Sequence, residues 1–210
     1  NIGYADLNAL NFDKRGTSKI SLNSNADFLS TKDKKILGKV EVTDITLENS
    51  DGRFNAGDIY LNSFSDNSMY KVGLDADFAE GSFRGTAPID RFIKDLLNVT
   101  IGKELPALLD NDGWKWEGNS YDLDFTFHNV MEILPFILPG AYIEKGTKLK
   151  AGISTDGLMS AELVSGRIAY RENYFKGVRL KADNSDNVFG GELKAGEIRA
   201  ASLLLRDNYF

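Results

Sequence analysis

The stretch Ile45–Phe83 decides the fold, and it reads ITLENSDGRFNAGDIYLNSFSDNSMYKVGLDADFAEGSF. Apolar and polar residues alternate through it, a period of two that is typical of β-strands with one apolar and one polar face. The apolar positions are Ile45, Leu47, Ile59, Leu61, Tyr70, Val72, Leu74, Ala76 and Phe78. The turn sequence Asn49–Gly52 separates two of these strands. The stretch therefore predicts consecutive antiparallel strands with their apolar side chains on one face.

A similar unit returns about 120 residues later as IAYRENYFKGVRLKADNSDNVFGGELKA. In this alignment Gly57 matches Gly177, and Leu61 matches Leu180. We therefore predict a weak internal repeat of a three-strand unit, over residues 38–85 and 161–198.

Strand patterns fill most of the remaining chain. The apolar residues change from even to odd positions between Val42 and Ile45, so we expect a bulge near Thr43–Asp44 that keeps both on one face. Near the end we expect two strands, Val188–Lys194 and Ile198–Leu205. The total is about a dozen strands, mostly antiparallel neighbours, so the chain is predicted to be mainly β.

One segment has helical spacing instead. Its apolar residues recur at i, i+3, i+4, i+7 and i+8, and they are Ile89, Phe92, Ile93, Leu96 and Leu97. Thr86 is a candidate N-cap, and Pro88 suits the first turn. A second, short helix is expected after Asn129, with Pro135 ending it.

The composition excludes several classes of protein. The 210 residues are 42% hydrophobic and 27% charged, as in a folded soluble domain. The net charge of −6 provides no basic footprint for nucleic acid. The chain contains no cysteine, which excludes disulfides and thiolate chemistry. No apolar run approaches the roughly 18 residues that span a bilayer. We expect no cofactor and no metal.

Candidate catalytic residues are few. His128 is the only histidine, and no orienting partner for it is evident. Asp75 with Asp77, and Asp122 with Asp124, each place two carboxylates on one strand face, as glycoside hydrolysis requires. Because both pairs fall on the polar side of amphipathic strands, a solvated face is the favoured interpretation. We therefore expect a non-enzymatic protein.

Two tryptophans suggest a different class of function. Trp114 and Trp116 could stack on a sugar ring, which would make the chain a secreted β-sandwich that binds glycans. The favoured interpretation is that they anchor a loop to the fold. The nearby sequence Asp110–Gly113 resembles part of a calcium loop but lacks the first acidic ligand and the closing glutamate.

The apolar face of the strands allows two interpretations. It could close on itself, as in a β-sandwich or a helix-covered sheet, or it could form a partly open trough that holds acyl chains. Periodicity predicts both equally. The residues expected to line a lipid groove are Ile20, Leu22, Val40, Val42, Ile59, Leu61, Val72, Leu74, Leu123, Phe125, Leu149, Ile153, Ile168, Tyr170, Val178, Leu180 and Leu193.

The order of several segments resembles the TamB family (translocation and assembly module), in particular its Bacteroidetes-type members. The strongest match, Asn119–Asn187, contains NSYDLDF, ILPFILPGAYIEKGTKLKAGIS and RIAYRENYFKGVRLKADNSDN. The segments YKVGLDADF, SFRGTAPID and RFIKDLLNVTIGKELPALL precede it in the family's order. The AsmA-like proteins are a second family that the sequence could resemble.

The resemblance implies an envelope protein of diderm bacteria, anchored in the inner membrane by an N-terminal helix. Its curled antiparallel amphipathic sheet, a β-taco or half-barrel trough, would cross the periplasm. The groove is thought to carry phospholipid acyl chains between inner and outer membrane, and to support outer-membrane protein assembly with a barrel partner. This chain, residues 1–210, would be one internal segment of such a protein. The family has no catalytic residues.

The helix Ile89–Leu97 must bury its apolar stripe within such a trough. About a dozen strands would give a groove of roughly 55 Å. We expect the helix to cover part of it, which makes this segment closer to a filled domain than to an open conduit.

Overall fold

The computed structural model describes residues 2–7, 9, 18–30, 36–50, 52–66, 68–102, 115–185, 188–201 and 203–209. In this part of the chain thirteen strands form one antiparallel sheet. The strands are β1 (Ile2–Asp6), β2 (Lys19–Ser30), β3 (Ile36–Asn49), β4 (Gly52–Asp66), β5 (Met69–Ala76), β6 (Ala79–Gly85), β7 (Tyr121–Phe127), β8 (Ala141–Ile143), β9 (Lys148–Ile153), β10 (Met159–Tyr170), β11 (Asn173–Asp183), β12 (Gly190–Ala200) and β13 (Leu203–Tyr209). The mainly β prediction is confirmed.

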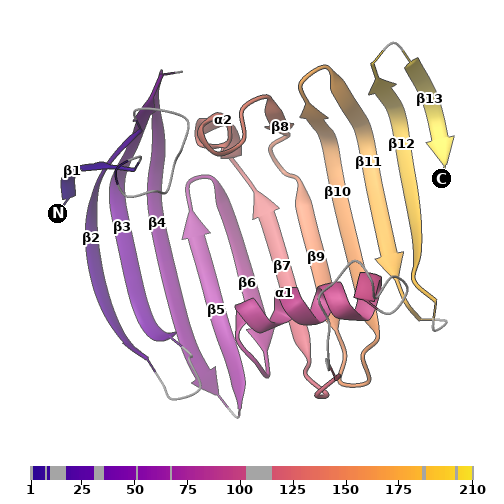
Figure 1. Ribbon diagram of the computed structural model, residues 1–210, viewed down its shortest axis with the longest axis horizontal. Helices are drawn as coiled ribbons and strands as arrows, with labels where there is room; N and C mark the ends of the chain where they lie inside the picture. The colour runs from indigo at the N-terminus through magenta and orange to yellow at the C-terminus, as the bar shows by residue number, and fades with distance from the viewer. Residues whose placement is uncertain are drawn as a thin grey trace.

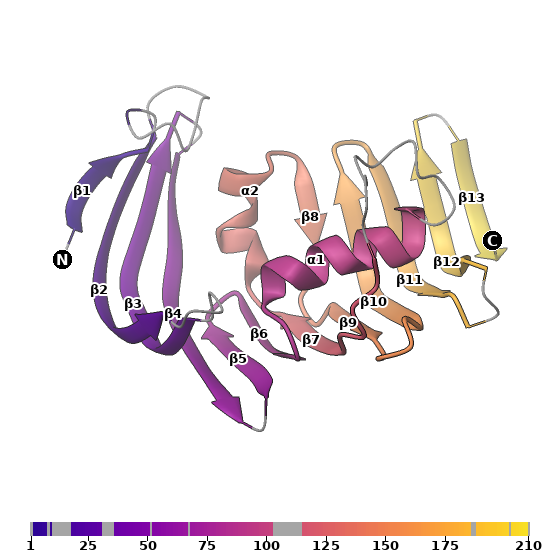
Figure 2. The ribbon, with the colours of Figure 1, turned by 60° about the horizontal axis from the view of Figure 1, so that its bottom comes forward.

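Two helices complete the described part of the chain. The first, α1 (Ile89–Leu97), has the predicted bounds and continues as a π-helical turn, Asn98–Gly102. The second, α2 (Leu134–Ile137), follows a 3-10 turn, Val130–Glu132. Figures 1 and 2 show α1 lying across the strands, and α2 lies near the opposite ends of these strands.

The sheet is a meander in which sequence neighbours pair. The exception is β8, which pairs with the far end of β10, so that β7 pairs directly with β9. The described sheet is open, with β1 and β13 at its edges (Figure 1). Figure 2 shows it curling, with the long strands β2–β4 turned away from the others. The predicted curled amphipathic sheet with one amphipathic and one short helix is therefore confirmed.

The bulge expected near Thr43–Asp44 is present. The register between β3 and β4 shifts between Val42 and Ile45, and Asp44 has a φ of 56°. Because of this shift, Val42 and Ile45 both pack on one apolar cluster. The bulge thus keeps the apolar face continuous along β3.

A glycine and two aspartates support this bulge. Gly57 lies opposite Ile45 with a φ of 68°, and a Cβ there would collide with the Asp77 carboxylate. The Asp44 N–H donates to Asp58, and the Asp58 N–H donates to Asp77, at 3.0 and 3.2 Å. Asp77 lies just after the end of β5, and its carboxylate supports the bulge through the Asp58 N–H. It therefore does not share a strand face with Asp75, contrary to the prediction.

Three local predictions were wrong. The break expected between Lys194 and Ile198 lies inside β12, because pairing with β11 continues through Glu197 opposite Lys176. Thr86 does not cap α1, since its hydroxyl donates to Asn119 and accepts the Ser120 N–H. Pro135 lies in the first turn of α2, where a missing N–H costs nothing, and does not end the helix.

Candidate functional site

The helix-facing side of the sheet carries apolar side chains in rows that cross the strands. Directly opposed residues of neighbouring strands share a face, so the pairing registers define these rows. One row is unbroken across nine strands. We call it the apolar row, and its members are Val40, Leu61, Leu74, Gly81, Phe125, Leu149, Leu163, Leu180 and Leu193. With about 4.8 Å between strands, it is roughly 40 Å long.

The apolar row is only partly covered. None of its nine members is buried, and Leu61 and Leu180 are 37% and 39% exposed. The one position without a side chain, Gly81, is filled by the ring of Phe125, which lies where a Cβ would stand. The row therefore presents a continuous hydrocarbon surface.

On one side of the row lies a closed core beneath α1. This α1 core consists of Tyr70, Phe83, Phe92, Val99, Tyr121, Ile153 and Met159, from α1, its π-helical turn and five strands. Phe83 is its centre, 2% exposed, with the Phe92 and Tyr121 ring centroids at 5.8 and 6.1 Å. Phe83 is two residues from Gly81 along β6, so the α1 core directly adjoins the row.

A buried aspartate anchors α1 to the sheet. Asp95 is fully buried and accepts hydrogen bonds from the Tyr121 hydroxyl at 2.7 Å, Asn119 at 3.1 Å and Arg91 at 2.9 Å. Burial, together with the hydrogen bond and charge of Asp95, raises the pKa of Tyr121 far above its ordinary value. Sequence periodicity missed Asp95, although a carboxylate within an apolar stripe is the signal that could have found it.

A buried asparagine holds the far end of the helix. The Asn184 side chain accepts the Met159 N–H at 2.6 Å and donates to the carbonyls of Gly157 and Val99, at 3.1 and 3.5 Å. It thereby joins β11, the β9–β10 turn and the turn after α1. Two polar contacts thus fix where α1 lies.

On the other side of the row a second core packs under α2. This α2 core consists of Ile45, Leu47, Ala56, Val130, Ile133, Leu134 and Phe136. Ile59 and Phe127 pack against it, and they stand two residues along their strands from Leu61 and Phe125 of the row. The apolar row is therefore the strip of sheet between two cores.

The five apolar residues of α1 do not all cover the sheet. Phe92 is buried and Leu96 packs against the α1 core, as expected. Ile89, Ile93 and Leu97 differ from the prediction, since they are 42%, 56% and 40% exposed. Their spacing of four residues places them on another face of the helix, because the apolar arc is wider than its contact with the sheet.

The other residues expected to line a groove are distributed between the row and the cores. Ile20, Leu22, Val42 and Ile59 pack on the α2 core, and Val72 and Leu123 on the α1 core. Ile153 and Val178 are buried. Ile168 and Tyr170 pair with β8. Seven of the seventeen, Val40, Leu61, Leu74, Phe125, Leu149, Leu180 and Leu193, lie in the apolar row. Leu163 is a further member that periodicity did not single out.

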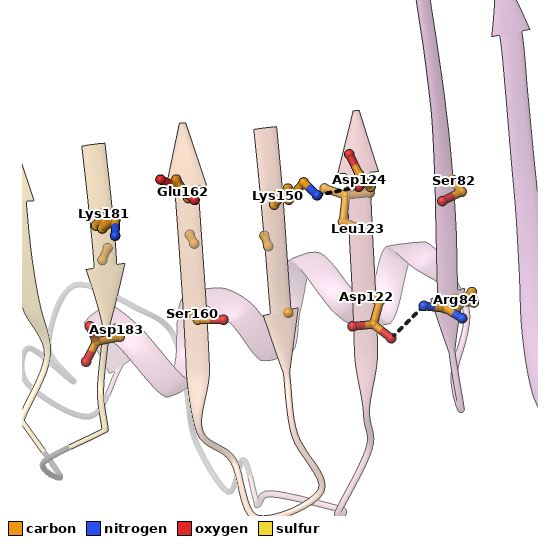
Figure 3. A pocket seen from close by; sticks show the side chains of 14 residues that line it. Ser82, Arg84, Asp122, Leu123, Asp124, Lys150, Ser160, Glu162, Lys181 and Asp183 are labelled. Atoms are coloured by element: carbon orange, nitrogen blue, oxygen red, sulfur yellow. Dashed lines mark ion pairs between the residues drawn. The ribbon is translucent and has the colours of Figure 1, made fainter. Parts of the chain in front are cut away.

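The opposite face of the sheet is polar. A shallow hollow of about 540 Å³ lies there. Figure 3 shows side chains that line it, with α1 behind the sheet. Asp122 pairs with Arg84 at 3.5 Å, and Asp124 with Lys150 at 3.1 Å. All four side chains are more than half exposed. The carboxylate pair Asp122 and Asp124 is therefore divided between two cross-strand ion pairs, as in a solvated face.

The described contacts of the remaining candidate catalytic and sugar-binding residues are those of structural residues. His128 Nε2 lies 3.7 Å from the Glu80 carboxylate, beyond hydrogen-bonding distance. Trp116 packs on the α1 core, and its indole N–H donates to the Thr155 carbonyl at 2.8 Å, which fits a loop anchor. Trp114 and the segment Asp110–Gly113 lie outside the described residues.

The described residues offer neither a metal site nor a membrane helix. Among them, no three His, Cys, Asp or Glu side chains group together as metal ligands do. No helix in the same ranges is both long and apolar enough to cross a membrane. No protein-family model matches the chain, and the searches of curated proteins and of solved structures found no match either.

Proposed function

We propose that this chain is a non-enzymatic, lipid-carrying segment of a periplasmic cell-envelope protein, with phospholipid acyl chains lying along the apolar row. The single observation that carries the proposal is the row itself. A strip of partly exposed leucine, valine and phenylalanine side chains crosses nine strands without one polar interruption. Contiguous exposed apolar surface of this kind is typical of a binding site.

The dimensions of the strip suit a hydrocarbon chain. Successive rows are two residues apart along each strand, which is about 6.7 Å. In the middle of the sheet one row separates the α1 core from the α2 core, so the uncovered strip has the width of about one acyl chain. A lipid would then lie across the strands with its tail on the row.

The resemblance to the TamB family supports the wider role. In that family a curled antiparallel sheet of this type is thought to carry phospholipid between the inner and outer membranes and to support outer-membrane protein assembly. On this proposal the protein acts in the periplasm, its full-length form is anchored in the inner membrane, and an outer-membrane barrel protein is its partner. The same proposal holds for an AsmA-like protein, in which the apolar row would also carry acyl chains.

A pair of adjacent residues provides the test. Leu149 belongs to the apolar row, and Lys150 points to the polar face of the same strand. A photo-reactive residue is placed at each position, and the purified chain is irradiated with labelled phosphatidylethanolamine vesicles. We expect acyl-chain adducts at position 149 and several-fold fewer at position 150. Equal labelling at both positions, or none at 149, would contradict the proposal.

A further inference from the structure

A second cluster lies on the polar face of the sheet, where β8, β10, β11 and β12 meet. Ile143, Ile168, Phe175 and Ile198 are directly opposed there, and Ile143 packs on the α2 core. Along β10 the apolar face thus changes from odd residues at Leu163 to even residues at Ile168. The residues that alternate with these four therefore face away from the helices. These are Tyr142, Ala169, Tyr174 and Arg199, with Arg167, Lys176, Glu197 and Arg206 in the next row.

Cations converge on the aromatic rings of this cluster. The Arg167 guanidinium carbon lies 5.2 Å from the ring centroid of Tyr142 and 5.1 Å from that of Tyr174. Lys176 Nζ and the Arg199 guanidinium approach the same Tyr174 ring, at 4.8 and 5.9 Å. Three positive charges thus surround one phenol ring, which holds them by cation–π attraction.

The cluster has too few carboxylates for its cations. Glu197 contacts Lys176 at 2.9 Å, Arg206 at 3.7 Å and the Tyr174 hydroxyl at 2.5 Å. Within the described ranges, Arg167 and Arg199 have no carboxylate within 4.0 Å. The cluster has four cationic side chains, and among the described residues Glu197 is the one carboxylate in contact with them. Its net charge is therefore +3. Elsewhere on this face Arg84, Lys150 and Arg179 each have an acidic partner.

A second observation also points to an anion as the ligand. The Nε of Arg167 is buried and makes no hydrogen bond in the described structure. A buried N–H without an acceptor is destabilising, and more so when the group is charged. Such a donor between two tyrosine rings is poised for an anion.

We infer that this cluster, centred on Arg167, Tyr174 and Arg199, is a binding site for a phosphate group. A phosphate monoester carries about −1.5 to −2 charges and three acceptor oxygens, which suits the excess charge better than one carboxylate does. An arginine guanidinium can donate two parallel hydrogen bonds to two such oxygens. The same chemistry is presented by free phosphates and by the headgroup of phosphatidic acid. The site is on the opposite face from the apolar row and is independent of the proposed lipid path.

Calorimetric titration with pyrophosphate tests the site. We expect binding that weakens at least about tenfold in Arg199→Gln, because a charged hydrogen-bond donor is lost. Arg179→Gln is the matched control, since Arg179 lies on the same face, carries the same charge and is paired with Glu162 at 3.5 Å. Arg199 is exposed, so its substitution leaves the fold intact; thermal unfolding of both variants verifies this.

Vesicles distinguish the two sources of phosphate. Flotation with phosphatidylcholine vesicles, with and without phosphatidic acid, is measured for wild type, Arg199→Gln and Arg179→Gln. Arg199-dependent binding to both pyrophosphate and phosphatidic acid supports a lipid headgroup as ligand, and binding to pyrophosphate alone supports a soluble phosphate. Absence of pyrophosphate binding, or an equal loss in both variants, would overturn the inference.

Discussion

Five strands, β5–β7, β9 and β10, carry both the α1 core and part of the apolar row, and no row member is buried as the core residues are. Phe83 and Ile153 in the core are each 2% exposed, whereas the row member Leu180 is 39% exposed. The side chains in both regions are apolar and face the same way. Alternation along the strands therefore determines which face is apolar, but the position of a helix determines which part of that face becomes a core.

Polar contacts determine where that helix lies. Asp95 joins α1 to β7 through Tyr121, and Asn184 joins the turn after α1 to β11. Apolar contacts alone would let the helix slide over the equally apolar row, because hydrophobic burial is not directional. Hydrogen bonds are directional, so these two residues keep α1 off the row.

The largest expected effect comes from the centre of the α1 core. Phe83→Ala should lower the free energy of unfolding by about 3–5 kcal/mol, because it leaves a cavity among Phe92 and Tyr121. Leu149→Ala in the apolar row should cost only about 1 kcal/mol, since less contact is lost at a partly exposed site than in the core. Urea denaturation followed by tryptophan fluorescence measures both. Equal losses would show that the row is part of the core.

Loss of the buried carboxylate should have the next largest effect. Asp95→Ala leaves Tyr121, Asn119 and Arg91 without their shared acceptor, so we expect about 3 kcal/mol of destabilisation. The control is Asp90→Ala on the exposed first turn of the same helix, which should cost about 0.5 kcal/mol. Urea denaturation compares the two variants. A cost for Asp95→Ala no larger than for Asp90→Ala would refute the anchoring role.

Much of this fold could be predicted from the sequence because its signals are local. Alternation predicted the strands, the spacing of Ile89 to Leu97 predicted α1, and the change of phase between Val42 and Ile45 predicted the bulge. The glycines matched in the repeat, Gly57 and Gly177, both have positive φ, 68° and 59°. The repeat itself stays a prediction.

The candidate site could be predicted only in part, because it depends on register. Alternation cannot show that Leu74, Phe125 and Leu163 belong to one row, since that follows from four separate strand pairings. It likewise cannot show which apolar residues a helix will cover. Asp95 and Asn184 were missed for the same reason, because their partners are distant in sequence.

A polar substitution in the row should separate binding from stability. Leu163→Asn should change the free energy of unfolding by about 1 kcal/mol, while acyl-chain adducts at position 149 should fall several-fold, because Leu163 lies directly opposite Leu149. Val164→Asn, on the polar face of the same strand, is the control and should leave the adducts unchanged. Undiminished adducts in Leu163→Asn would mean that the row does not hold the lipid.

The smallest expected effect is a pH dependence confined to the α1 core. The pKa of Tyr121 is raised above its ordinary value of 10.0 by burial and by Asp95. Above about pH 10 this tyrosine ionises in the unfolded chain but not in the folded one, so the free energy of unfolding falls as the pH rises. Urea denaturation at about pH 9 and pH 11 should show a shallower fall in Tyr121→Phe than in wild type. The exposed Tyr170 provides the control, because Tyr170→Phe should keep the wild-type slope. An unchanged slope in Tyr121→Phe would show that the hydroxyl is not held as a neutral donor to Asp95, and would remove one of the two contacts that keep α1 off the row.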